Sequence, residues 1–135
     1  MASATVLADW KAWLAANFTA CPVIYENEPA TLPEPPSAWI FVELMGRLYS
    51  QESIGAGPPA ANWWRESGDT YLHVWVPSNS GSAVARGHAE TLAMALRGAI
   101  LGVDTKIKDM YIGDGGNSDD GAWWRITLRV EWERG

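Results

Sequence analysis

The stretch AWWRITLRVEWER, residues 122–134, decides the fold because its side chains alternate almost without fault. Successive side chains of a β-strand point to opposite faces of a sheet, so a period of two predicts one buried and one exposed face. The apolar face comprises Trp124, Ile126, Leu128, Val130 and Trp132. The opposite face comprises Trp123, Arg125, Thr127, Arg129, Glu131 and Glu133. We expect the first face to join a core and the second to meet water or a partner, since it resembles no active site.

The segments before this stretch alternate between helical and strand patterns. Apolar residues at helical spacing predict helices over Ala4–Phe18, capped by Ser3, and over Ala83–Gly98, capped by Ser82. The predicted strands are Val23–Glu26, Trp39–Gln51, Asn62–Pro77, Thr105–Gly113 and Ala122–Arg134, the last two forming a hairpin. This order predicts an α+β fold, with one mainly antiparallel β-sheet and two α-helices on one face. We expect a single domain over residues 1–135.

The second and third predicted strands are longer than a small core can cover. A tip rich in glycine and proline separates them, from Glu52 to Pro59. We therefore expect a projecting β-hairpin arm over about residues 52–69, which pairs or packs against another molecule. The earlier segment Asn27–Ser37 contains four prolines and is expected to be a stiff, extended connector.

Bulk composition narrows the class of protein. A chain of 135 residues buries about two-thirds of its unfolded surface and needs no disulfide or metal to fold. Its single cysteine, Cys21, is expected to be a small buried apolar side chain. The net charge of −6 argues against direct binding to nucleic-acid phosphates. The sequence contains neither an apolar run long enough to span a membrane nor the pattern of a secretory signal.

The sequence offers little that is typical of catalysis or metal binding. The loop Asp114–Gly121 is rich in aspartate and glycine, but Gly116 and Ser118 occupy positions where a calcium loop needs strong oxygen ligands, so a plain hairpin loop is preferred. His73 lies between aromatic residues in a strand and is expected to be packed or hydrogen-bonded. We expect no enzyme activity and no cofactor.

Nine tryptophans are unusual for a chain of this length, and two pairs are adjacent in sequence. Neighbouring residues of a strand point to opposite faces, so one member of Trp63-Trp64 and one of Trp123-Trp124 must lie outside the core. Tryptophan is enriched at the energetic centres of protein interfaces. An interface role is therefore preferred over the alternative, in which one ring of each pair lies flat on the surface.

Several short motifs follow one another in a fixed order along nearly the whole chain, and the order is more informative than any motif alone. They are the first helix with Trp10, Trp13 and Phe18, PVIYENEP at 22–29, WIFV at 39–42, the return through Gly68 to VWVP at 74–77, the turn at Gly81, the alanine-rich second helix, and GAWWRITLRV at 121–130. In this order the chain resembles the tail terminator, or tail completion, proteins of long-tailed bacteriophages.

This resemblance implies a structural virion protein without catalysis or cofactor. Such proteins form a homohexameric ring on the head-proximal end of the tail tube, where they stop tube polymerisation and offer a joining surface to the head–tail connector. DNA passes through the lumen without sequence-specific binding. The implied partners are further copies of the chain, the tail tube protein and the connector, and the implied location is the virion tail, assembled in the host cytoplasm.

A closed ring needs two different surfaces that dock on each other, which gives a hypothesis for the residues involved. One half is the arm and the other is the open face of the last strand. The proposed interface residues are Trp63, Trp64, Arg65, Trp123, Arg125 and Arg129. The proposed lumen-facing acidic loop, which would repel DNA, contains Asp114, Asp119 and Asp120.

Two alternatives stay open at the level of sequence. The first is another ring protein of the same apparatus, either a head–tail connector or completion protein or a tail tube protein. The second, less favoured, is a small α+β ligand-binding domain or enzyme, for which the sequence offers only His73, His88 and scattered carboxylates.

Overall fold

A computed structural model describes residues 2–113 and 115–135. The elements in chain order are α1 (Ala4–Asn17), β1 (Val23–Tyr25), β2 (Trp39–Gln51), the 3-10 helix η1 (Pro59–Ala61), β3 (Trp64–Pro77), α2 (Ala83–Leu96), β4 (Ile100–Leu101), β5 (Thr105–Ile112), β6 (Gly116–Asn117) and β7 (Trp123–Arg134). The predicted α+β class is confirmed, and the long strands end within two residues of their predicted bounds.

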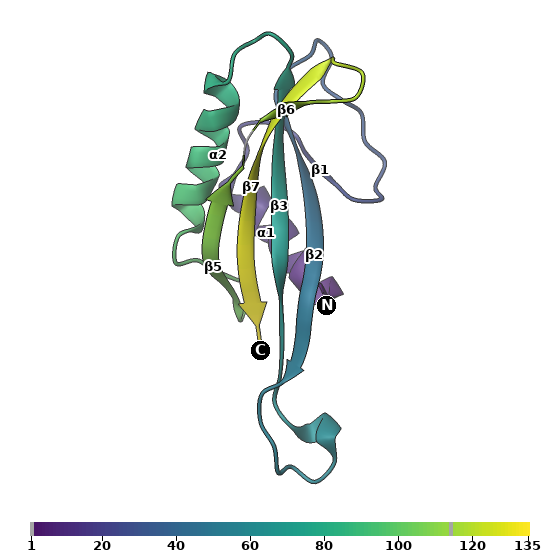
Figure 1. Cartoon of the computed structure of the whole chain (residues 1–135), viewed down its shortest axis with the longest axis vertical. Coiled ribbons are helices and arrows are strands. Elements are labelled where there is room, and N and C mark those ends of the chain that lie inside the picture. The colour runs from purple at the N-terminus through teal and green to yellow at the C-terminus, as the bar shows by residue number, and fades with distance from the viewer. Residues whose placement is uncertain (1, 114) are drawn as a thin grey trace.

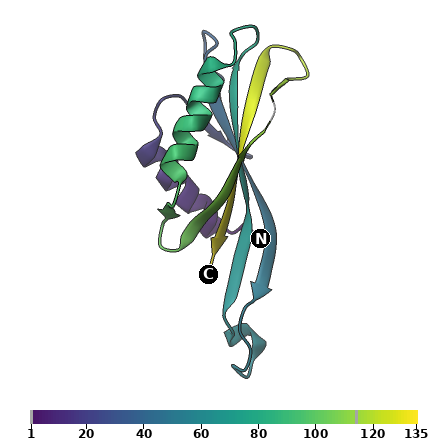
Figure 2. The same ribbon diagram turned by 60° about the vertical axis from the view of Figure 1, so that its left-hand side comes forward.

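The strands form one curled sheet in the order β1-β2-β3-β7-β5-β4, and β6 pairs with β7. All pairs are antiparallel except β1 with β2, which is parallel. Both helices lie on the same face of the sheet, as predicted (Figures 1 and 2). The opposite face, which we call the outer face, is covered by no described segment of the chain (Figure 2).

The core lies between the helices and the inner face of the sheet. From α1 it takes Val6, Trp10 and Leu14, and from α2 it takes Ala85, Ala89, Leu92 and Leu96. The strands contribute the residues predicted from their alternation, namely Ile40, Val42, Leu72, Val74, Val76, Ile126, Leu128, Val130 and Trp132, all buried. Small alanines on α2 allow this helix to approach the sheet closely, because they present no bulk at the contact.

The structure confirms one of the two predicted helix caps and contradicts the other. The Ser3 hydroxyl accepts a hydrogen bond from the Val6 N–H at 3.3 Å, which confirms it as the N-cap of α1. Ser82 precedes α2, but its hydroxyl accepts no helix N–H and is instead bonded by the Arg86 side chain. Its backbone is already helical, with φ −102° and ψ −5°, whereas a capping side chain needs an extended backbone.

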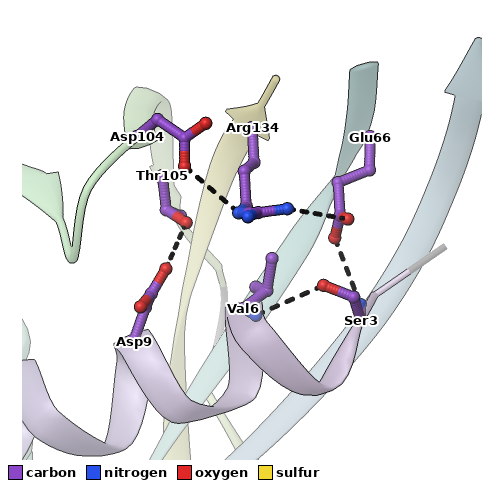
Figure 3. A network of polar contacts seen from close by, with 7 residues as sticks. All are labelled: Ser3, Val6, Asp9, Glu66, Asp104, Thr105 and Arg134. Atoms are coloured by element: carbon purple, nitrogen blue, oxygen red, sulfur yellow. Dashed lines mark hydrogen bonds and ion pairs between the residues drawn. The ribbon is translucent and has the colours of Figure 1, made fainter. Parts of the chain in front are cut away.

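A polar network fixes the start of α1 to the sheet (Figure 3). The Ser3 N–H donates to Glu66 of β3 at 3.1 Å. Arg134, the last residue of β7, lies between Glu66 at 3.7 Å and Asp104 at 3.1 Å. In the same region the Thr105 hydroxyl donates to Asp9 of α1 at 2.7 Å. Polar side chains outside the apolar core therefore join α1 to β3, β5 and β7.

The arm projects beyond the body of the sheet, as predicted, but it is shorter than residues 52–69 (Figure 1). Residues 66–69 of β3 pair with residues 131–134 of β7, so they belong to the sheet. The projecting part, called the arm from here on, is residues 50–65. The predicted bound was too long because charged residues such as Glu66 and Asp69 are typical of an exposed strand. In the structure both are buried, and ion pairs with arginines compensate their charges.

Candidate interaction surface

The outer face is built from alternate residues of three neighbouring strands. The register places Trp39, Trp75 and Arg125 in one row, Phe41, His73 and Thr127 in the next, and Glu43, Tyr71 and Arg129 in a third. Directly paired residues of antiparallel strands project from the same face. The outer face therefore combines the face predicted for residues 123–133 with aromatic side chains that β2 and β3 supply.

Aromatic rings fill the half of the outer face farthest from the arm. The Trp39 and Trp75 rings stack with centroids 5.8 Å apart, and Trp123 meets Trp39 edge to face at 5.8 Å. The Arg125 guanidinium lies 5.5 Å above the centre of the Trp75 ring. The Trp39 indole N–H is buried without an acceptor among the described residues, which is costly for an isolated chain. The structure thus places Trp123 and Arg125 together on an uncovered aromatic surface.

His73 occupies the centre of the outer face and is held on all sides. Its ring stacks between Phe41 and Tyr71. Its Nδ1 lies 2.7 Å from the Thr127 hydroxyl, and its Nε2 lies 3.2 Å from a Glu43 carboxylate oxygen. Burial, aided by the nearby positive charge of Arg125, lowers the pKa of His73 despite the opposing effect of Glu43. The packed, hydrogen-bonded histidine predicted from the sequence is confirmed.

Charged side chains fill the half of the outer face nearest the arm. Arg129 lies 3.4 Å from Asp69 and 3.6 Å from Glu131, and Arg47 reaches the same two carboxylates at 3.9 Å. The Asp69 carboxylate, 3.4 Å from the Arg129 Nε, raises the pKa of Arg129. Arg129 therefore lies on the predicted face, but its charge is already shared with partners in its own chain.

The arm separates its two tryptophans, as the alternation requires. Trp63 has 46% of its surface exposed, and the Arg65 guanidinium covers its ring at 4.7 Å. Trp64 points to the other side, where its ring packs on Tyr49 with centroids 5.4 Å apart and its Nε1 donates to the Pro59 carbonyl at 3.1 Å. Trp63 is thus exposed beside a half-buried Arg65, whose guanidinium also lies 3.9 Å from Glu133, whereas Trp64 holds the shape of the arm.

The second tryptophan pair separates in the same way at the other end of the sheet. Trp124 packs partly against the core, and Trp123 lies on the outer face. Trp123 pairs with Pro77, the last residue of β3, whereas Trp64 is the first residue of that strand. The arm and the aromatic half of the outer face are therefore at opposite ends of the molecule, and a contact between them requires two copies.

The described part of the acidic loop forms a hairpin, but it is not all turn as predicted, because Gly116 and Asn117 pair with β7 as the short strand β6. Asp120 accepts hydrogen bonds from the Ser118 hydroxyl at 2.6 Å and from the Ala122 N–H at 3.0 Å, and these bonds lower its pKa. Asp119 is exposed beside it, and Asp114 lies outside the described residues. Within residues 2–113 and 115–135, no group of three histidine, cysteine, aspartate or glutamate side chains is arranged to hold a metal ion.

Cys21 and the two histidines, the remaining reactive side chains considered, are packed against other side chains of the fold. Cys21 packs against the core, and burial raises the pKa of its thiol to about 11, so it stays protonated near neutral pH. His88 meets Phe18 edge to face on the helical side of the sheet, while His73 lies on the outer face. The two histidines therefore cannot act on one substrate.

Comparisons with known proteins extend to the fold and no further. No protein-family model matches the chain, and no curated protein matches its sequence. One solved structure, of a protein without a functional name, has a TM-score of 0.68 and 17% identity and covers 96% of this chain and 93% of its own. A likeness at this identity is evidence for the fold alone. No described helix is long and apolar enough to cross a membrane.

Proposed function

We propose that this chain is a structural protein that forms a ring on the head-proximal end of a phage tail tube, stops tube polymerisation and provides the head–tail joining surface. The observation that carries the proposal is an arm with an exposed tryptophan at one end of the molecule and, at the other, a sheet face on which Trp39, Trp75 and Trp123 are partly exposed. Both leave aromatic surface in contact with water when the chain is alone, and both are typical of surfaces that meet a partner. The proposal that this partner surface belongs to a ring on a phage tail comes from the resemblance of the ordered sequence motifs to tail terminator proteins.

Two different surfaces on one chain favour a ring over a two-fold dimer. Contacts between unlike surfaces repeat from copy to copy and close when the rotation permits. Trp63 and Arg65 of the arm would contact the next copy directly, and Trp64 would hold the arm in shape. On the receiving side, Trp123 and Arg125 are more available than Arg129, which is paired within its own chain. The hexameric copy number comes from the resemblance.

The net charge suits a ring through which DNA passes. A charge of −6 repels phosphates and lets a duplex slide without adhering. The exposed carboxylate of Asp119, with Asp114 and Asp120 in the same loop, would contribute to that repulsion if the loop faces the lumen. The partners of this proposal are the tail tube protein and the head–tail connector, the location is the virion tail, and no cofactor or catalytic step is involved.

Tail length is the measurement that tests this function. Particles assembled with and without the chain would be compared by electron microscopy. Overlong tails without heads in its absence are the expected result. Tubes of normal length that fail only to join heads would identify a connector, and the absence of any tube would identify a tube subunit. Unchanged particles would contradict the proposal and revive the ligand-binding or enzyme alternative.

A further inference from the structure

The two lateral edges of the sheet are covered over only a small part of their length. β1 pairs with residues 40–42 of β2, and β4 pairs with residues 105–106 of β5. Beyond these, Glu26 accepts the Leu44 N–H, and no other described strand pairs with the outer side of β2 or β5. We call residues 45–51 the β2 edge and residues 108–112 the β5 edge. Such uncovered edges are templates for pairing with another chain.

Both edges carry exposed apolar side chains. Met45, Leu48 and Tyr49 on the β2 edge are 50%, 56% and 50% exposed, and Tyr111 and Ile112 on the β5 edge are 48% and 53% exposed. Neither edge contains a proline, the residue that most effectively prevents pairing. Charged residues, namely Arg47, Lys108 and Asp109, and a bulge in each strand protect one end of each edge, so the stretches open to pairing are residues 48–51 and 110–112.

The directions of the strands make the two edges complementary. β2, β3, β7 and β5 are consecutive antiparallel neighbours, so β2 and β5 run in opposite directions at opposite edges (Figure 1). When a second copy is placed beside the first by rotation about an axis along the strands, its β5 lies antiparallel to the β2 of the first. The two edges differ, so the contact repeats from copy to copy without being self-complementary.

The two edges lie at different heights along the strands, so two copies that pair through them are offset along the strand direction. The register places Met110 level with Leu44, through Val130 and Thr70. The β2 edge is centred on Leu48, which the bulge after Gly46 places level with Ser67, three register positions nearer the arm than Thr70. Pairing the centres of the two edges therefore shifts the neighbour toward the arm by roughly 10 Å, at about 3.3 Å per residue. A stagger of this kind accompanies the strand tilt of closed sheets, and it brings the neighbour's body beside the arm.

We propose that the β5 edge of one copy pairs antiparallel with the β2 edge of the next, so that the sheet continues from copy to copy. This inference rests on the proposed ring and names the surfaces that join its members. The arm, residues 50–65, then lies along the neighbour and supplies a second contact.

Hydrogen bonds within the sheet identify the backbone donors available to a neighbour. The Gly113 N–H donates to the Thr127 carbonyl at 2.8 Å, so by alternation the Ile112 N–H points outward. The Glu52 N–H donates to the Trp63 carbonyl at 2.7 Å, so the Tyr49 N–H likewise points outward. Proline at either position removes a donor from the edge without removing a bond inside the sheet.

The test compares Ile112→Pro and Tyr49→Pro with Ile112→Ala and Tyr49→Ala, which lose the same side chains but keep the N–H. Sedimentation velocity of the full chain measures assembly, and circular dichroism checks folding. We expect rings from the wild type, rings of lower stability from both alanine variants, which lose side-chain contacts but keep the edge donors, and folded monomers from each proline variant. An equal mixture of the two proline variants should form a heterodimer and stop there, because each brings one intact edge.

Three results would overturn edge pairing. Proline variants that form wild-type rings would overturn it and leave the ring proposal standing. A mixture of folded proline variants that stays monomeric would also overturn it. If a proline variant fails to fold, hydrogen exchange on the wild type decides: the Tyr49 and Ile112 amides should exchange at least about tenfold more slowly in the ring than in the monomer, and equal rates refute the pairing. Rings that pair by their edges yet leave tail length unchanged would refute the proposed function alone.

Discussion

At the scale of single residues, the tryptophans divide into those that hold the fold and those that face outward. Trp10 is fully buried in the core, whereas Trp63 projects from the arm and touches chiefly Arg65. Trp63→Ala should therefore change the free energy of unfolding by less than about 0.5 kcal/mol while raising the concentration at which rings form. Trp10→Ala, the matched control, should cost about 3–5 kcal/mol. Urea denaturation and sedimentation measure the two quantities, and rings of unchanged stability in Trp63→Ala would contradict a role for the arm.

His73 gives a prediction of pH dependence at the same scale. Its pKa is lowered in the folded chain, whereas the unfolded chain titrates near the ordinary value of about 6.5. The unfolded state therefore binds the proton more readily, and stability falls as pH falls through about 6.5 until the lowered folded pKa is reached. His73→Gln should remove this part of the pH dependence. Denaturation midpoints at pH 7.5 and pH 5 check it, and equal pH responses of the two proteins would refute it.

At the scale of elements, two glycines show how packing decides the effect of one methyl group. A Cβ on Gly68 of β3 would lie 2.7 Å from the Trp132 ring and would also collide with the Met45 carbonyl, whereas a Cβ on Gly87 of α2 would meet nothing within 4 Å. Gly68→Ala should destabilise the chain by at least about 1 kcal/mol through overpacking. Gly87→Ala should stabilise it by about 0.5–1 kcal/mol, since glycine is unfavourable inside a helix. Thermal denaturation of both variants measures this, and shifts of the same sign would contradict the packing described for β3.

At the scale of the whole molecule, the arm and the body should be separable. None of the buried core residues lies in the arm. Replacing residues 51–64 by Asn-Gly joins Ser50 to Arg65, which are paired across the hairpin. Counting two residues back from the hydrogen-bonded Glu52–Trp63 pair, they form a hydrogen-bonded pair, which a two-residue turn needs at its base. We expect the shortened chain to fold with an unfolding temperature within a few degrees of the wild type and to form weaker rings or none. Calorimetry and sedimentation measure both, and full-strength rings from a folded shortened chain would show that the arm contributes nothing to assembly.

The sequence by itself determined the order of the two helices and of β1, β2, β3, β5 and β7, the core faces and the two-sided character of β7, because alternation and helical spacing are local properties of the chain. It also indicated that one member of each tryptophan pair lies outside the core. Only the tertiary structure decided that β1 is parallel to β2, that Glu66 and Asp69 belong to the body, and that Trp39, Trp75 and Trp123 meet on one face. Strand order and register join residues far apart in sequence, so no local pattern encodes them. The strands β4 and β6 have two residues each, too few to show a period in the sequence. They are strands only because they pair with β5 and β7.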